Sequence, residues 1–154
     1  IVKRFFASGF GVGLVWQNIF GNKKGGGSLA PLIFTILIYY LNLNVLELSV
    51  VFLLLLILYF YSVEDHFADD DPSWITLDEI VGMSLVSLAS PSEMLPLFAG
   101  FLVFRASDIL KQPKFVSQLE DYPGKLGVLY DDLGAGLLGL LSGTIVHQVS
   151  LLTL

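Results

Sequence analysis

Long apolar runs separated by short polar segments make up most of this chain. Residues 29–41 and 45–61 are two such runs, and a helix over the second is long enough to cross about 30 Å of hydrocarbon. Three more follow, over residues 74–90, from Leu95 to about Lys111, and over residues 126–154. The pattern predicts an all-α, polytopic membrane bundle of about five helices.

The segments between these runs are glycine-rich or polar. Residues 1–28 are rich in glycine, and we expect a short interfacial segment followed by a turn. Gly9, Gly11 and Gly13 interrupt the apolar residues there, so we expect no signal peptide at this start. Residues 64–73 are expected to lie in water, and residues 112–125 are expected to form a polar loop before the last helix.

Composition supports a membrane environment. The chain is 55% hydrophobic and only 14% charged, whereas about a quarter of the residues in a soluble domain are charged. Its 154 residues suit one domain, 1–154. The net charge of −6 argues against nucleic acid as a partner. The absence of cysteine excludes disulfide scaffolds, thiolate zinc sites and cysteine nucleophiles.

The charges fall unevenly across the predicted bundle. If the five helices alternate in direction, one face carries every basic residue, namely Lys3, Arg4, Lys23, Lys24, Arg105, Lys111, Lys114 and Lys125. The positive-inside rule makes that face cytoplasmic, as in a multi-pass protein of a bacterial-type inner membrane. Of the fourteen carboxylates, only Glu47 and Glu93 lie towards the other face. Both signs of charge on one face suit a site that handles a metal and a phosphate.

Two adjacent carboxylates, Asp78 and Glu79, stand at the start of the third predicted helix, with Thr76 as its expected N-cap. Adjacent helical residues point about 100° apart, so one carboxylate can face the bundle while the other contacts water. The ordinary alternative is a favourable helix-dipole pair, which contributes about 0.3–1 kcal/mol. Because these acids enter a membrane helix, we favour a functional role.

Arg105, Asp108 and Lys111 follow one another at spacings of three residues near the end of the fourth helix. This spacing puts them roughly on one helical face. Arginine can bind a phosphate through two nitrogens, aspartate can ligate a metal, and lysine adds a positive charge. The alternative is a salt-bridge ladder at the membrane interface, which would be the better interpretation of this motif alone.

Asp131 and Asp132 are adjacent in a run that is otherwise made of apolar and small residues. Ionisable residues inside membrane helices are costly and usually functional. Two carboxylates this close repel each other unless a cation or a proton intervenes. A hard cation such as Mg²⁺ prefers carboxylate oxygens. His147, deeper in the same helix, is expected to form a hydrogen bond between helices.

Taken in order, the three motifs resemble the phosphatidylglycerophosphatase A family. That family pairs D-E-x-x-G-M, F-R-x-x-D-x-x-K and G-x-G-x-x-x-D-D-x-x-A-G segments, which correspond here to residues 78–83, 104–111 and about 125–136. The glycine-rich opening from Ser8 is similar as well. Three segments depart from the family pattern. Lys-Lys-Gly-Gly stands where the family has P-G-T, and Lys111-Gln112-Pro113-Lys114 replaces K-P-x-P. The first glycine of the last motif is matched imperfectly by residues 123–127.

The resemblance implies Mg²⁺-dependent hydrolysis of phosphatidylglycerophosphate, a phospholipid phosphomonoester in the bilayer, to phosphatidylglycerol and phosphate. Its implied metal ligands are Asp78, Glu79, Asp131 and Asp132. Asp108 would complete the ligand shell or act as a base, and Arg105 and Lys111 would neutralise the phosphate. Two alternatives stay open. One is a non-catalytic ion-binding or transport protein, and the other is a family member that binds lipid without turnover.

Overall fold

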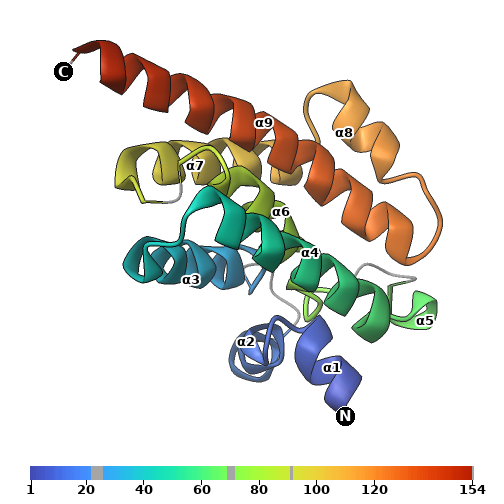
Figure 1. The fold of residues 1–154 in the computed structure, drawn as a ribbon. Coiled ribbons are helices and arrows are strands. Elements are labelled where there is room, and N and C mark those ends of the chain that lie inside the picture. Colours follow the sequence, from blue (N-terminus) through green and yellow to red (C-terminus); the bar gives the residue numbers. More distant parts are fainter. Residues whose placement is uncertain (22–25, 69–71, 91, 154) are drawn as a thin grey trace.

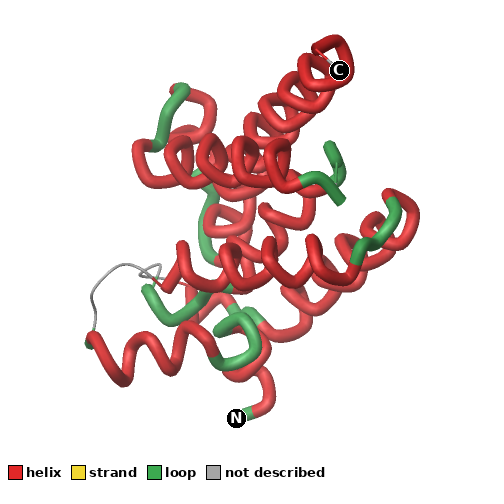
Figure 2. The backbone as a smooth tube through the Cα atoms, turned by 90° about the vertical axis from the view of Figure 1, so that its left-hand side faces the viewer, coloured by secondary structure: helices red, strands yellow, loops and turns green. Residues whose placement is uncertain are grey.

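The computed structural model describes residues 1–21, 26–68, 72–90 and 92–153. Within these ranges the regular structure is all helix, and short loops and turns join the helices, as Figures 1 and 2 show. The all-α prediction is therefore confirmed. The described helices are α1 (Val2–Ala7), α2 (Val12–Phe20), α3 (Gly26–Leu41), α4 (Val45–Ser62), α5 (Asp65–Ala68), α6 (Leu77–Ser87), α7 (Met94–Leu110), α8 (Lys114–Leu119) and α9 (Lys125–Thr153).

Helix α6 lies at the centre, where α3, α4, α7 and α9 all pack against it (Figure 1). Leu77, Val81 and Met83 are completely buried there. At 11 residues, α6 is about 16 Å long at 1.5 Å per residue, which is too short to cross a bilayer. The predicted helix over 74–90 was therefore too long. Its apolar residues contact protein on all sides, a pattern that also occurs in membrane spans.

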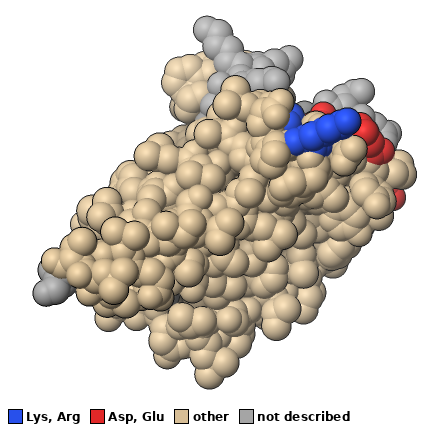
Figure 3. Space-filling model, turned by 90° about the horizontal axis from the view of Figure 1, so that it is seen from above, with Lys and Arg blue, Asp and Glu red and all other residues tan. Residues whose placement is uncertain are grey.

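Helices α4 and α9 are the two described helices long and apolar enough to cross a membrane. Only 22% of the apolar window in each is buried inside the protein, so they differ from the core helix of a soluble protein. Figure 3 shows a face on which the visible Lys, Arg, Asp and Glu gather at one edge. These two exposed apolar helices indicate that the protein associates with a membrane. The predicted arrangement of about five membrane helices is not confirmed.

Helices α7 and α9 pack closely and antiparallel. A Cβ atom on Gly139 of α9 would lie 2.7 Å from the backbone oxygen of Gly100 in α7, so the two backbones almost touch. At one end of the pair, His147 Nδ1 lies 2.9 Å from Oε1 of Glu93, the N-cap residue of α7, so the two helices are in contact there, but the predicted hydrogen bond is not formed among the described residues. At the other end, Lys111 reaches Asp131. This packing sets the position of the second motif relative to the third.

Short helices form in two segments that the sequence did not predict to be helical. The segment predicted as a polar loop over 112–125 includes α8, which packs on α9 and buries Val116 completely. One buried apolar side chain was too weak a signal to predict a helix. The glycine-rich start forms α1 and α2, joined by a turn in which Gly9 and Gly11 have φ of 66° and 91°. Glycine adopts this left-handed region without a Cβ clash.

The N-terminal turn is joined to the start of α6. Thr76 occupies the predicted N-cap position, but its side chain makes no capping hydrogen bond. Instead the Thr76 hydroxyl donates to the Ser8 carbonyl at 2.8 Å, and the Thr76 N–H donates to the Ala7 carbonyl at 3.1 Å. These contacts hold α1 against the helix that carries Asp78 and Glu79.

Candidate active site

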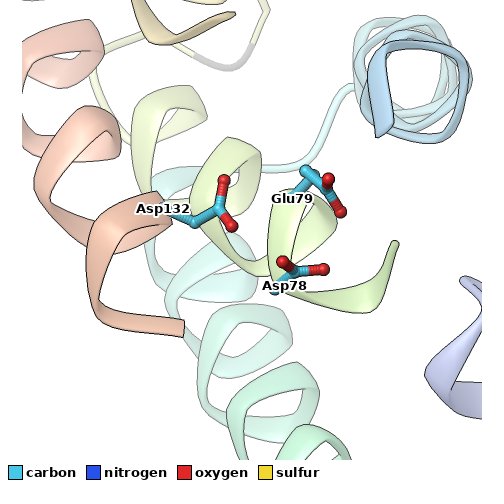
Figure 4. A group of neighbouring side chains, drawn as sticks. All are labelled: Asp78, Glu79 and Asp132. Atoms are coloured by element: carbon cyan, nitrogen blue, oxygen red, sulfur yellow. The ribbon is translucent and has the colours of Figure 1, made fainter. Parts of the chain in front are cut away.

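Three helices bring the predicted site residues together. The first turn of α6 carries Asp78 and Glu79, and α9 carries Asp131 and Asp132 close to its start. Figure 4 shows Asp132 facing Asp78 and Glu79 across the gap between α9 and α6. The last turn of α7 carries Asp108. Residues from three separate motifs therefore converge in space.

The convergence forms one cavity of about 300 Å³. All seven predicted site residues line it. The other lining residues come from the start of α3, the segment before α6 and the end of α7: Gly27, Ser28, Pro72, Ser73, Ile75 and Ile109. Lys23 and Lys24, and the aspartates at 69–71, lie outside the described residues. Acidic and basic groups thus share one space large enough for a phosphate group.

The carboxylates form two overlapping groups. Oxygen atoms of Asp78, Glu79 and Asp132 lie within 4.8 Å of one another, and so do oxygen atoms of Asp108, Asp131 and Asp132. Asp132 belongs to both groups. Asp78, Asp131 and Asp132 each expose 2–3% of their surface. Both groups have the spacing of ligands around a metal ion.

Each carboxylate of the first group has one buried oxygen without a hydrogen-bond partner among the described residues. The buried oxygens Asp78 Oδ1, Glu79 Oε2 and Asp132 Oδ1 accept no hydrogen bond from any described residue. Burial and the neighbouring charges of Glu79 and Asp132 raise the pKa of Asp78 well above its ordinary value. Burial also raises the pKa of Glu79, to about 7. A bound cation would remove both penalties, and an all-oxygen ligand set fits Mg²⁺.

The second group already holds basic side chains. Arg105 Nη1 donates to Asp108 Oδ2 at 2.6 Å, and Lys111 Nζ donates to Asp108 Oδ1 at 3.0 Å and to Asp131 Oδ2. Burial alone would lower the pKa of Lys111, but the charge of Asp108 and the hydrogen bond to Asp131 outweigh it and raise that pKa. The expected salt-bridge ladder is therefore present, and it lines the cavity rather than a lipid surface.

Two further residues at the start of α3 touch the site and are not among the seven predicted site residues. The Ser28 hydroxyl accepts a hydrogen bond from Arg105 Nε at 3.2 Å. Gly27 leaves room for Glu79, since a Cβ there would collide with Glu79 Oε1. In the sequence, the only indication of these two contacts was the Gly-Ser pair that follows Lys-Lys-Gly-Gly. A contact between α3 and α7, however, could be seen only in the fold.

The fold and cavity define an all-helical protein in which buried carboxylates and basic groups converge, as they do in sites that handle phosphate. The phosphatidylglycerophosphatase A family model matches residues 5–147. The chain therefore belongs to the phosphatidylglycerophosphatase A family of lipid phosphatases, which are phosphoric monoester hydrolases.

One curated relative supports the same class. A protein of Bacteroides thetaiotaomicron named "Putative phosphatidylinositol-3-phosphatase" is 38% identical over 71 residues. The match covers 44% of this chain and 44% of that protein, so this chain spans less than half the length of the relative. No solved structure matches the chain.

Proposed function

We propose that this protein is a Mg²⁺-dependent lipid phosphatase that converts phosphatidylglycerophosphate and water to phosphatidylglycerol and phosphate. One observation carries the proposal. Three buried carboxylate oxygens without partners among the described residues, on Asp78, Glu79 and Asp132, line the same cavity as Arg105 and Lys111. A site for a hard cation therefore lies beside a site for a phosphate. Family membership supports the reaction class.

In this proposal Asp78, Glu79 and Asp132 hold the metal ion. When bound, Mg²⁺ would supply Lewis-acid stabilisation of the phosphate oxygens and orient water. Ligands from α6 and α9 tie the two helices together at the site. Asp131 is the fourth ligand predicted from the sequence. Its Oδ2 atom accepts a hydrogen bond from Lys111, and its role as a ligand stays a prediction.

Arg105 is the proposed phosphate-binding group. Its Nη1 and Nε atoms are held by Asp108 and by Ser28 from another helix, so the guanidinium is oriented before substrate arrives. Preorganised donors stabilise developing charge without paying for reorganisation during the reaction. Asp108 accepts hydrogen bonds from both Arg105 and Lys111, which suits positioning of these two cations. Its action as a general base stays a prediction.

The proposed orientation in the membrane is based on the positions of the basic residues. We propose that the protein crosses a bacterial-type inner membrane several times, with the lipid acyl chains in the bilayer and the phosphate entering the cavity from the cytoplasmic face. The basic residues Lys111 and Lys125 lie at the end where α7 finishes and α9 begins. The positive-inside rule favours the cytoplasm for that end.

Ion transport by the same acids is a weaker proposal. A transport path needs ionisable groups that connect both faces of the membrane. Here the paired acids gather at one end of α9, whereas Glu93 with His147 stands near its other end. Arg105 and Lys111 in the same cavity would also repel a passing cation. A phosphatase uses both kinds of group, because the acids can hold a metal ion and the basic groups can bind the phosphate.

The test is phosphate release by the purified protein from phosphatidylglycerophosphate, phosphatidic acid and phosphatidylinositol 3-phosphate, each with Mg²⁺ or with EDTA. We expect fastest release from phosphatidylglycerophosphate, complete dependence on Mg²⁺, and loss of release in Asp132→Asn. Faster release from phosphatidylinositol 3-phosphate would mean that the substrate is the one in the relative's name, and that the proposed substrate is wrong. Undiminished release in EDTA, or by Asp132→Asn, would overturn the metal-dependent mechanism.

A further inference from the structure

The second acidic group has the geometry of a metal site but contains a lysine. Three buried aspartates, Asp108, Asp131 and Asp132, bring oxygen atoms within 4.8 Å of one another. Lys111 Nζ lies among them, 3.0 Å from Asp108 Oδ1 and in contact with Asp131 Oδ2. Its other acidic neighbour is Glu120, at 3.7 Å. An ammonium group therefore stands where a second cation would be expected.

The backbone of Lys111 is unusual for a lysine. Lys111 ends α7 in the left-handed conformation, with φ of 52° and ψ of 43°. Glycine or asparagine adopts this conformation more readily than a residue with a long side chain. A residue chosen only to end the helix would be glycine. The lysine side chain is instead directed back to Asp108, one turn earlier, and across to Asp131 on α9.

The charge of the cavity leaves room for one divalent ion. The cavity contains five carboxylates, and Arg105 and Lys111 are the basic groups among its described lining residues. If all seven groups are ionised, one divalent ion leaves the cavity slightly negative, whereas a second would reverse the sign of its net charge. A second divalent ion would also have to displace Lys111 Nζ from Asp108 and Asp131.

We propose that Lys111 is a tethered cation that fills the second cation position, so that the site binds one divalent ion, held by Asp78, Glu79 and Asp132. This inference rests on the proposed Mg²⁺-dependent function and sets its metal stoichiometry. Asp132 belongs to both acidic groups, so it would connect the ion site to the group that contains Lys111. Phosphatases with two metals clamp the phosphate between ions about 3.5–4 Å apart. Here the ion and Lys111 would form the clamp.

The experiment counts bound ions with Mn²⁺, which also prefers oxygen ligands and is visible by electron paramagnetic resonance. Purified protein in detergent is titrated with Mn²⁺. We expect one ion per chain in the wild type and in Lys111→Arg, which keeps the charge. Lys111→Met should bind two ions and show the exchange-coupled signal of a close pair. Lys114→Met is the matched control, because Lys114 is exposed in α8, and it should bind one.

A second neutral variant is needed in case Lys111→Met does not fold. Lys111→Gly removes the same charge and suits the left-handed backbone, so it should fold and also bind two ions. Two ions in the wild type, or one ion in both neutral variants, would overturn the inference. If the wild type binds one ion and needs it for phosphate release while the neutral variants also bind one, the proposed function survives. If the wild type binds no ion, the proposed metal-dependent function fails as well.

Discussion

Gly27 shows how a residue without a side chain can control the site. It lies in the first turn of α3, beside the cavity, where a Cβ would collide with Glu79 Oε1 and lie 3.4 Å from Arg105 Nη2. Both atoms belong to the ends of long side chains, so these would move and the backbone would stay. Glycine at this position therefore lets Glu79 keep its oxygens directed at Asp78 and Asp132.

We expect Gly27→Ala to weaken metal binding while the protein stays folded. Displacing Glu79 should raise the Mg²⁺ concentration for half-maximal phosphate release about tenfold, as changes beside metal ligands commonly do. The thermal unfolding midpoint should change little. Gly143→Ala is the control for tight packing elsewhere, since its Cβ would lie 3.1 Å from Ala89 Cβ and 3.2 Å from the Pro96 carbonyl oxygen, and neither residue lines the cavity. Equal Mg²⁺ dependence in the two variants would show that Gly27 does not position Glu79.

Helical spacing was sufficient to predict the two side-chain pairs within the second motif. Arg105, Asp108 and Lys111 could be placed on one face because helical spacing is regular, and both predicted i, i+3 pairs are present. The contact of Lys111 with Asp131 could not be predicted in this way. It depends on where α7 crosses α9, and on the left-handed backbone of Lys111.

At the scale of helices, the site depends on how closely α7 and α9 approach. Gly100 and Gly139 face each other, and a Cβ on Gly139 would lie 2.7 Å from Gly100 O and 2.7 Å from Val86 Cγ2. A backbone oxygen in a packed helix cannot move aside as a flexible side chain can. Phe104, one turn before Asp108, is 3.1 Å from the same position. Spacing at this crossing therefore affects the second acidic group.

We expect Gly139→Ala to lower both stability and activity. Overpacking of a close helix contact commonly costs about 1–3 kcal/mol, and the separated helices would pull Lys111 and Asp108 from Asp131. The measurements are thermal unfolding in detergent and phosphate release at saturating Mg²⁺. Leu141→Ala, at an exposed position of α9, should leave both nearly unchanged. A stable, fully active Gly139→Ala protein would mean that the crossing tolerates a wider spacing.

Helix prediction succeeded where apolar residues face the outside of the protein. The ranges 45–61 and 126–154 correspond closely to α4 and α9. The helix predicted at α6 is present but shorter than expected, and an apolar run does not reveal whether its neighbours are lipids or other helices. Prediction missed α8, where a single buried residue, Val116, connects a short helix to α9.

For the whole molecule, the arrangement of charge defines two ends. At one end Lys3 pairs with Glu64, and Lys111 pairs with Asp131. Tyr59 near the end of α4 donates to the Lys125 carbonyl at the start of α9 at 2.6 Å, so these helix ends meet. In Figure 1, α4 and α9 run along the same diagonal in opposite chain directions. The start of α4, capped by Asn44 and Glu47, then points towards the other end.

Labelling of single cysteines would test this two-ended arrangement, because the chain contains no native cysteine. Lys114→Cys places a thiol on exposed α8 at the site end, and Leu46→Cys places one beside the charged Glu47 at the start of α4. Both positions are exposed, so a water-soluble maleimide can reach either thiol from the appropriate side. In intact cells we expect the reagent to label Leu46→Cys, and to label Lys114→Cys only after the membrane is permeabilised.

The four possible labelling patterns separate orientation from crossing. Labelling of Lys114→Cys but not Leu46→Cys in intact cells would mean that the helix ends lie on opposite sides, as proposed, but that the site faces outwards. Labelling of both before permeabilisation, or of neither, would mean that α4 does not cross the bilayer. The protein would then be held at one surface by the apolar faces of its helices, and the lipid phosphate would have to be drawn from that surface into the cavity.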